Sequence, residues 1–574
     1  MPKGITQILP RSHSLKRWIL AVSVALVFIH VLGRSREEDH FPDLYDASIP
    51  ELQDGLDAGH FSSVDLVNAY FARIEEVNLK GPTLRAVLET NPSALEQAAA
   101  LDEERRKTGK RSLMHGIPIL LKDTIATLAS EGMNTTAGSY ALLGSIVPDD
   151  AEVVKRLRKA GAIILGKTNL SEFSHARGAL ALGWSGRGGQ SVSAFYPNGD
   201  PCGSSSGSAI AVSIGLSAAA LGTETDGSIA CPASNNNIVG LKPTVGLISG
   251  AGVIPISSTQ DSVGPMTRTV ADSAILLSLA EPSSSASNYT RALSPSFLSG
   301  KRIGIPRRVF MDPAISGVDA YVYERFAWAL RVMEKLGAVL VDPADLPDAD
   351  EILVAHGNET LVCDTDLKIE LNAYLEALEA NPSGVRSLAD LIAFNNAHPE
   401  LEKPLGYGSQ SDLIRAQATT GRNAAYYEAL ALNRELGATR GIDGALKAYN
   451  LDALVLPAPG FVFPAPGFVT GPPAIAGYPI LTLPLGFYPA HTRPRATGPR
   501  TVYPAPGMPF GISFWGTKGS EDVLLGIGYA FERATRVREG GRGSITPVVQ
   551  LRHVVGRKVR VRWWDWRGGL GWVR

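Results

Sequence analysis

Amphipathic segments alternate with short apolar runs through the first third of this chain, and this alternation limits the folds open to it. A serine followed three residues later by an acidic residue marks helix starts at Ser48 and Ser62. Helical spacing of apolar residues predicts further helices over 93–107 and 152–159. Apolar runs predict strands over 84–88, 117–121 and 162–165. Such alternation is typical of a layered α/β fold.

The second half of the chain predicts two further regions. Residues 340–446 are more polar and helix-like, and we interpret them as a peripheral helical layer, a place where substrate choice is often determined. A cluster of proline and glycine over 457–473 comes next. The apolar run 474–485 follows it and predicts a late strand of the core, so the chain is expected to return to its sheet.

The charge balance argues against several classes of partner. Fifty-five basic and fifty-six acidic residues leave a formal net charge of −1 over 574 residues, which gives no reason to expect nucleic acid as a partner. The ten histidines include no pair at metal-ligand spacing, and the glycine-rich loop 178–189 lacks the order of a dinucleotide fingerprint. We therefore expect neither a metal nor a cofactor.

The N-terminus has the order of a targeting segment. Basic residues precede an apolar run over 18–32, which predicts a signal peptide or signal anchor over 1–33 and a secreted or membrane-anchored protein; a cytoplasmic protein is the alternative. Fifteen residues are fewer than the roughly 20 that span a bilayer, so cleavage near Gly33 is favoured over anchoring. Four N-x-S/T triplets, at Asn134, Asn169, Asn288 and Asn358, suit a secretory route.

The C-terminal segment 547–574 is basic and rich in tryptophan. A membrane-surface or nucleic-acid tail is one interpretation. A poorly ordered extension is preferred, because nothing before it prepares a binding surface.

Cysteine is sparse. Cys202, Cys231 and Cys363 cannot build a disulfide framework, and at most one bridge can form. Cys202 and Cys231 flank two serine-bearing turns, where we expect them to pack as small apolar side chains without a catalytic role.

Two serine-bearing turns carry the chemistry. Pro201–Ser208 and Gly222–Ser228 are separated by an apolar run. A serine hydroxyl is a poor nucleophile, so its site must supply a base, a proton route and donors for an oxyanion. A lysine can be the base if burial lowers its pKa toward neutrality. Lys122, at the end of an apolar strand, is the natural candidate.

Several motifs in one order resemble the amidase signature family. They are residues 116–123, the Gly-Ser-Ser-x-Gly-Ser turn at 203–208, Thr225-Asp-Gly-Ser-Ile229 and Gly240-Leu-Lys-Pro-Thr244-Val-Gly. The similarity extends from about Phe41 to Glu539, and the corresponding domain is expected over 41–545. The resemblance implies an α/β fold with a central mixed β-sheet covered by helices on both faces.

The same resemblance implies a Ser-cisSer-Lys triad. Ser228 matches the nucleophile, Ser204, after a cis peptide bond, matches the serine that passes the proton, and Lys122 matches the base. Ser205 would support this relay. Backbone N–H groups of Thr225, Asp226, Gly227 and Ser228 would form the oxyanion hole, and an acyl-enzyme on Ser228 would be hydrolysed by water.

Two departures from the family pattern bear on the subgroup. Asp226 and Cys202 stand where many relatives have glycine, and aspartate tolerates a positive φ better than most residues. The variant most resembles the peptide amidase branch and its fungal relatives. It implies hydrolysis of a peptide C-terminal amide or a small carboxamide.

Other interpretations remain open at this point. A lipid amide hydrolase fits the apolar N-terminus, the A component of a glutamyl-tRNA amidotransferase complex shares the family, and a catalytically silent binding protein is possible. Outside the triad we expect Ser206 and Ser208 to cap a helix, and Lys167, Lys242 and His115 to make structural contacts. Glu224 either orients the site or is a structural carboxylate.

Overall fold

The computed structural model describes residues 41–282, 288–354, 356–458, 469–555, 562–564 and 570–572. The targeting segment predicted over 1–33, with its apolar run 18–32, lies outside these residues. Within the described ranges, no helix combines the length and the apolar character needed to cross a membrane.

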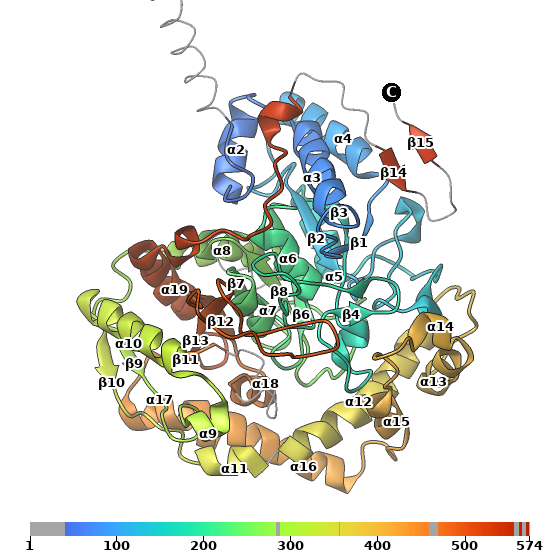
Figure 1. Cartoon of the computed structure of the whole chain (residues 1–574). Coiled ribbons are helices and arrows are strands. Elements are labelled where there is room, and N and C mark those ends of the chain that lie inside the picture. The colour runs from blue at the N-terminus through green and yellow to red at the C-terminus, as the bar shows by residue number, and fades with distance from the viewer. Residues whose placement is uncertain are drawn as a thin grey trace, which may run out of the picture.

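A mixed sheet runs through the molecule and takes its strands from residues 87–515 (Figure 1). Among the described residues it has eleven strands, in the order β1-β3-β2-β6-β8-β7-β12-β13-β11-β9-β10. The strands are β1 Val87–Thr90, β2 Pro118–Lys122, β3 Ile163–Thr168, β6 Ala219–Glu224, β7 Val239–Lys242, β8 Ser262–Thr267, β9 Arg302–Gly304, β10 Val339–Val341, β11 Ala453–Pro457, β12 Ile480–Phe487 and β13 Pro509–Trp515. The predicted α/β fold with a central mixed sheet is confirmed.

Parallel pairing is confined to two parts of this sheet. Strand β2 pairs in parallel with both β3 and β6, and β9 pairs in parallel with β10 and β11. Antiparallel pairs join the remaining neighbours, among them β6 with β8 and β12 with β13. Because β2 and β6 run side by side in the same direction, their C-terminal residues lie at one edge, and this places Lys122 next to the residues that end β6.

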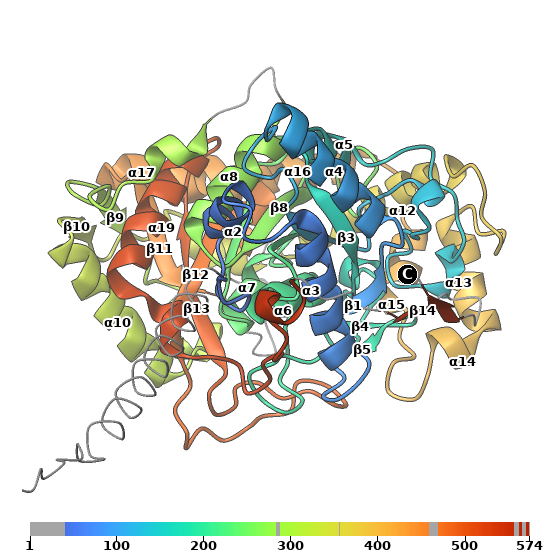
Figure 2. The same ribbon diagram turned by 90° about the horizontal axis from the view of Figure 1, so that it is seen from above.

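Helices flank the sheet, as Figure 2 shows from above. They include α2 Ile49–Asp57, α3 Ser63–Val77, α4 Ala94–Thr108, α5 Glu152–Lys159, α8 Val270–Ala280, α10 Ala320–Lys335 and α19 Glu521–Thr535. The predicted capping boxes are present: Ser48 pairs with Glu51 at the start of α2, and Ser62 with Asp65 at the start of α3. Each box satisfies N–H groups that a helix start leaves without a partner.

Two short helices carry the serine turns into the core. Helix α6 (Ser206–Ser213) and helix α7 (Ala230–Asn235) are buried along their whole length. A helix that is buried on all sides must be apolar or small all round. The small residues of the two serine motifs meet this requirement.

The predicted helical layer over 340–446 is present and lies along the lower side of the molecule in Figure 1. It contains α11 Ala349–Val354, α12 His356–Glu376, α13 Leu388–Ala397, α14 Pro399–Glu402, α15 Ser411–Gln417 and α16 Ala424–Arg434, followed by a π-helical stretch Glu435–Ile442 and by α17 Asp443–Tyr449.

Two boundary predictions were wrong in part. The first strand covers Val87–Thr90 instead of 84–88. The run 474–485 begins in helix α18 (Gly471–Ala476), with prolines at its first positions and Gly477 in a left-handed conformation at its end, so the strand starts only at Ile480. In the tail, β14 (Arg562–Trp564) and β15 (Leu570–Trp572) pair antiparallel.

Candidate active site

Lys122 ends β2 and is fully buried. Its Nζ donates to Ser204 Oγ at 2.6 Å, to Thr223 Oγ1 at 2.7 Å and to the Thr223 carbonyl at 3.0 Å. Burial lowers the pKa of Lys122 from 10.5 to about 7, against the opposing charges of Asp261 and Glu224. This amine can therefore lose its proton near neutral pH. The contact with Thr223, at the end of the neighbouring strand β6, was not foreseen from the sequence.

The turn that carries Ser204 is tightly held. The Gly203–Ser204 peptide is cis, as the family resemblance implied, and Ser204 is fully buried. A side chain at Gly203 would put a Cβ 2.3 Å from Ser171 Oγ, so only glycine fits there. Ser205 Oγ donates to the Thr223 carbonyl at 3.1 Å and accepts from Thr223 N–H at 3.2 Å, which ties the turn to β6.

Ser228 lies in the second turn, between β6 and α7. The residue is 8% exposed, and its carbonyl accepts from Ser205 N–H at 3.1 Å, so the two turns touch. Thr225, Asp226, Gly227 and Ser228 line one cavity together with Ser204. The structure thus brings these predicted site residues together at one cavity.

Cys202 and Asp226, the two positions where many relatives have glycine, differ in backbone conformation. Gly227 takes φ +76° and Cys202 takes φ +57°, whereas Asp226 adopts no positive φ. The tolerance of aspartate for this region is thus not needed. Asp226 instead presents its carboxyl near Glu359, and burial together with that neighbouring carboxylate raises the pKa of Asp226 well above its usual range.

Three side chains hold the Thr225–Ser228 turn in place through hydrogen bonds. Glu224 Oε2 accepts from Ile229 N–H at 2.5 Å and from Ala230 N–H at 2.8 Å, just beyond Ser228. Asp261 Oδ1 accepts from Thr225 Oγ1 at 2.6 Å, and Gln260 Nε2 donates to the Thr225 carbonyl at 3.4 Å. Of the two interpretations of Glu224, orientation of the site is the one that these contacts favour.

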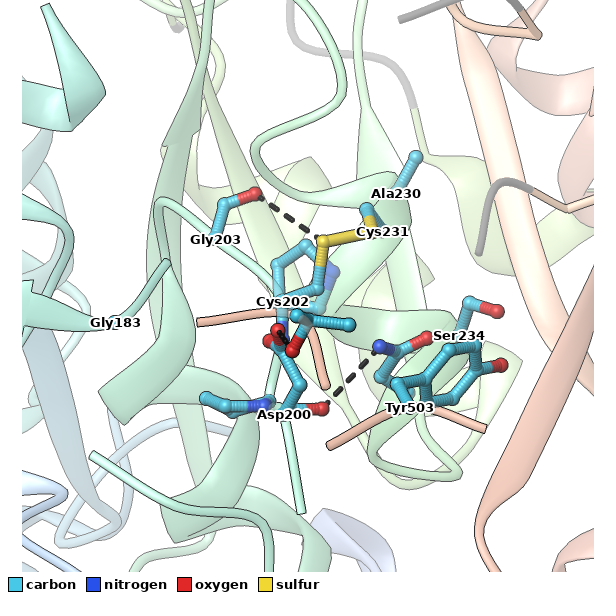
Figure 3. Close-up of a disulfide and its surroundings, with 12 residues drawn as sticks. Gly183, Asp200, Cys202, Gly203, Ala230, Cys231, Ser234 and Tyr503 are labelled. Carbon is cyan, nitrogen blue, oxygen red and sulfur yellow. Dashed lines mark hydrogen bonds between the residues drawn. A yellow bond between two sulfur atoms is a disulfide. The ribbon is translucent and has the colours of Figure 1, made fainter. Parts of the chain in front are cut away.

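A disulfide joins the two turns (Figure 3). Cys202 and Cys231 are bonded, with their Cα atoms 5.8 Å apart and a separation of 29 positions in sequence. Cys202 precedes Gly203–Ser204, and Cys231 follows Ser228 by three residues. The bridge therefore joins the backbone next to one serine to the backbone next to the other. The sequence allowed at most one bridge, and this is the bridge that forms; the bonded pair also packs with Leu182 in a small apolar cluster. Their burial next to each other at converging turns is what allows the bond.

The cavity measures about 310 Å³, at the lower end of the range for ligand pockets. The disulfide lines it, as do Ile256, Val469 and Thr470. One face of helix α12 forms a wall, with residues three or four positions apart: His356, Glu359, Thr360, Cys363, Asp364 and Leu367. The helical layer predicted over 340–446 thus reaches the site. Arg415 and Asp412 of α15 also line the cavity and are ion-paired with each other.

The residues outside the triad behave in part as predicted. Lys167 donates to the Ile125 carbonyl and to Thr135, Lys242 donates to the Tyr478 carbonyl, and His115 contacts the Leu101 carbonyl, all structural contacts. The capping prediction for Ser206 and Ser208 was wrong. Ser205 is the N-cap residue of α6 without a side-chain bond, while Ser208 Oγ bonds to Thr168 and to the Leu221 carbonyl.

Comparisons with known proteins identify the family to which the chain belongs. The model of the amidase family matches residues 65–525. The chain belongs to the amidase family. A protein of Arthroderma benhamiae whose name assigns it to the amidases is 38% identical over 559 residues, covering 90% of each chain. The solved peptide amidase of Stenotrophomonas maltophilia is 41% identical, with a TM-score of 0.76, and the match covers 88% of this chain and 99% of that one.

A less similar relative is named as a subunit of an amidotransferase. The A component of the glutamyl-tRNA(Gln) amidotransferase of Myxococcus xanthus is 34% identical over 85% of this chain and 97% of its own. The eleven-stranded sheet described above is the fold that this amidase shares with the solved peptide amidase. Sequence, fold and relatives therefore support the conclusion that this chain is an enzyme that hydrolyses amides.

Proposed function

We propose that this amidase hydrolyses a terminal carboxamide, of a peptide or of a small molecule, through an acyl-enzyme on Ser228. The observation that carries the proposal is the buried amine of Lys122, 2.6 Å from the Oγ of Ser204, which lines the same cavity as Ser228. The higher identity to a peptide amidase than to the amidotransferase component supports the choice of substrate.

The proposed steps use only groups of this chain. Neutral Lys122 accepts the proton of Ser204, and Ser204 accepts that of Ser228 as Ser228 Oγ attacks the amide carbon. Backbone N–H groups of the turn 225–228 stabilise the oxyanion, because they are fixed before the charge develops. The proton returns to the leaving nitrogen, ammonia departs, and water then hydrolyses the ester by the same relay.

The experiment is ammonia release from peptide amides, aryl amides and fatty amides. Ser228→Ala and Lys122→Met should each lose at least about 100-fold in kcat, the usual contribution of a nucleophile or a general base. Lys167→Met is the matched control, because it also removes a buried lysine of the sheet, with its pKa lowered by burial to about 8, but contacts neither serine. Its folded fraction should keep the activity. Full activity of Ser228→Ala would refute the proposal.

The panel also separates the alternatives. Preference for fatty amides would indicate a lipid amidase. Ammonia release from glutamine that appears only with co-purified partner proteins would indicate the amidotransferase role, which the Myxococcus relative makes the second candidate. Activity of the isolated chain on peptide amides agrees with neither.

A further inference from the structure

The four N-x-S/T triplets differ in what the fold allows at their asparagines. An N-linked glycan is attached through the side-chain Nδ2 and is bulky and hydrophilic, so its asparagine must stand at the surface. The geometry of each amide therefore decides which triplet can carry a glycan in the folded enzyme.

Asn169 is excluded by its contacts. It is fully buried, and its Nδ2 donates to the Arg85 carbonyl at 3.0 Å, to the Gly189 carbonyl at 3.1 Å and to Ser191 Oγ at 2.9 Å. These bonds tie Asn169 to two other segments of the chain. A sugar on Nδ2 would break them and would have no space.

Asn134 is excluded for the same reason. It is 9% exposed, its Nδ2 donates to Glu89 Oε2 at 3.0 Å, and its Oδ1 accepts from Gly144 N–H at 3.0 Å.

Asn358 is half-buried in the first turn of α12, directly before Glu359 of the cavity wall. A glycan there would crowd the substrate cavity.

Asn288 meets the requirements. It is exposed, and it begins a short 3-10 helix, η4 (Tyr289–Ala292), that packs against α8. Its Oδ1 accepts from the N–H and from the hydroxyl of Thr290, which is the third residue of the same triplet. A glycan would be attached to Nδ2 instead, so these hydrogen bonds do not block it. Tyr289 is buried and its N–H donates to Ser278 Oγ at 3.1 Å, so the turn is anchored. None of the four η4 residues lines the active-site cavity.

The disulfide supplies an independent argument about the compartment. Disulfides such as Cys202–Cys231 form and persist in oxidising compartments, which are also those of the secretory route. The basic-then-apolar order of residues 3–32 points the same way.

We propose that Asn288 is an N-glycosylation site and the one of the four triplets that bears a glycan. In the modification the Asn288 nitrogen attacks the anomeric carbon of a lipid diphosphate-linked oligosaccharide. The new bond is C–N, the bond from that carbon to the diphosphate oxygen breaks, the lipid diphosphate leaves with the electron pair, and the amide nitrogen loses one proton.

The test is expression of the full chain with its own N-terminus in a eukaryotic secretory host. Treatment with peptide N-glycosidase should lower the mass by one glycan and leave aspartate at position 288, as peptide mapping detects. Asn288→Gln and Thr290→Ala should each lose the glycan and keep amidase activity, while Asn358→Gln should keep the glycan. An unmodified chain in that host, or a glycan that persists in Asn288→Gln, would overturn the proposal.

Discussion

Lys122 and Ser204 are 82 positions apart in sequence, and the Nζ of one donates to the Oγ of the other at 2.6 Å inside the core. A fully buried lysine is costly while it is charged, because no water solvates the ammonium. The hydroxyl and carbonyl oxygens around Nζ compensate for part of that cost. The result is an amine whose pKa, lowered by burial to about 7, suits proton transfer at neutral pH.

The first prediction concerns the pH dependence of kcat/KM. The neutral form of Lys122 is the base, and burial lowers its pKa to about 7, so activity should rise through that pH and level off above it. Below the midpoint kcat/KM should fall about tenfold per pH unit, the slope of one titrating group. Initial rates of ammonia release from a peptide amide between pH 5 and pH 9 measure this. Activity that is constant across this range would contradict the role of Lys122.

The second prediction concerns Glu224, whose negative charge raises the pKa of Lys122. Glu224→Gln removes the charge but can keep the acceptor for Ile229 and Ala230, because Glu224 Oε1 has no hydrogen-bond partner among the described residues. The acidic limb of the pH profile should therefore move to lower pH.

Glu224→Ala is the contrasting variant. This variant removes the charge and the carboxylate acceptor together, so the N–H groups of Ile229 and Ala230 lose their partner. Each unpaired N–H group should cost about 1–3 kcal/mol of stability, and kcat should also fall because the turn is no longer held. An acidic limb that does not move in Glu224→Gln would show that Glu224 has only a structural role.

The third prediction concerns Gly227, which takes φ +76° directly before Ser228. Gly227→Ala should cost about 1–2 kcal/mol of stability for the left-handed conformation. It should also lower kcat, because the new Cβ would lie 3.1 Å from Thr470 Oγ1 and displace the turn.

Gly246→Ala is the matched control for Gly227→Ala. Gly246 takes φ +83°, and nothing lies within 4 Å of the position that a Cβ would take there, so the stability cost should be similar while kcat is unchanged. Urea unfolding and steady-state kinetics of both variants make the comparison. Equal kcat values for the two would contradict a positioning role of the turn.

The fourth prediction concerns the disulfide. Closing a loop between Cys202 and Cys231, 29 positions apart, stabilises the fold by about 3 to 4 kcal/mol through the unfolded chain. In the double variant Cys202→Ala/Cys231→Ala the free energy of unfolding should fall by that amount, which lowers the urea midpoint. The variant should also lose activity, because the two serine turns are no longer joined.

A reductant provides the control. Dithiothreitol should slow the wild-type enzyme and leave the rate of the double variant unchanged. A wild-type rate that survives verified reduction of the bridge would show that the disulfide stabilises the fold without positioning the serines.

The sequence by itself determined the alternation of helices and strands in the first third of the chain, the two serine turns and the lysine at the end of β2. These follow from local periodicity, capping residues and motifs, all of which are encoded within a few neighbouring positions.

Only the tertiary structure decided that Thr223, Asp261 and Glu224 surround the amine and the turn, that Cys202 bonds to Cys231, and that α12 supplies a cavity wall. It also decided where the left-handed conformations fall and which Asn-x-Ser/Thr triplets are buried. Most of these contacts join residues tens of positions or more apart, and they depend on strand order and burial, which no local pattern specifies.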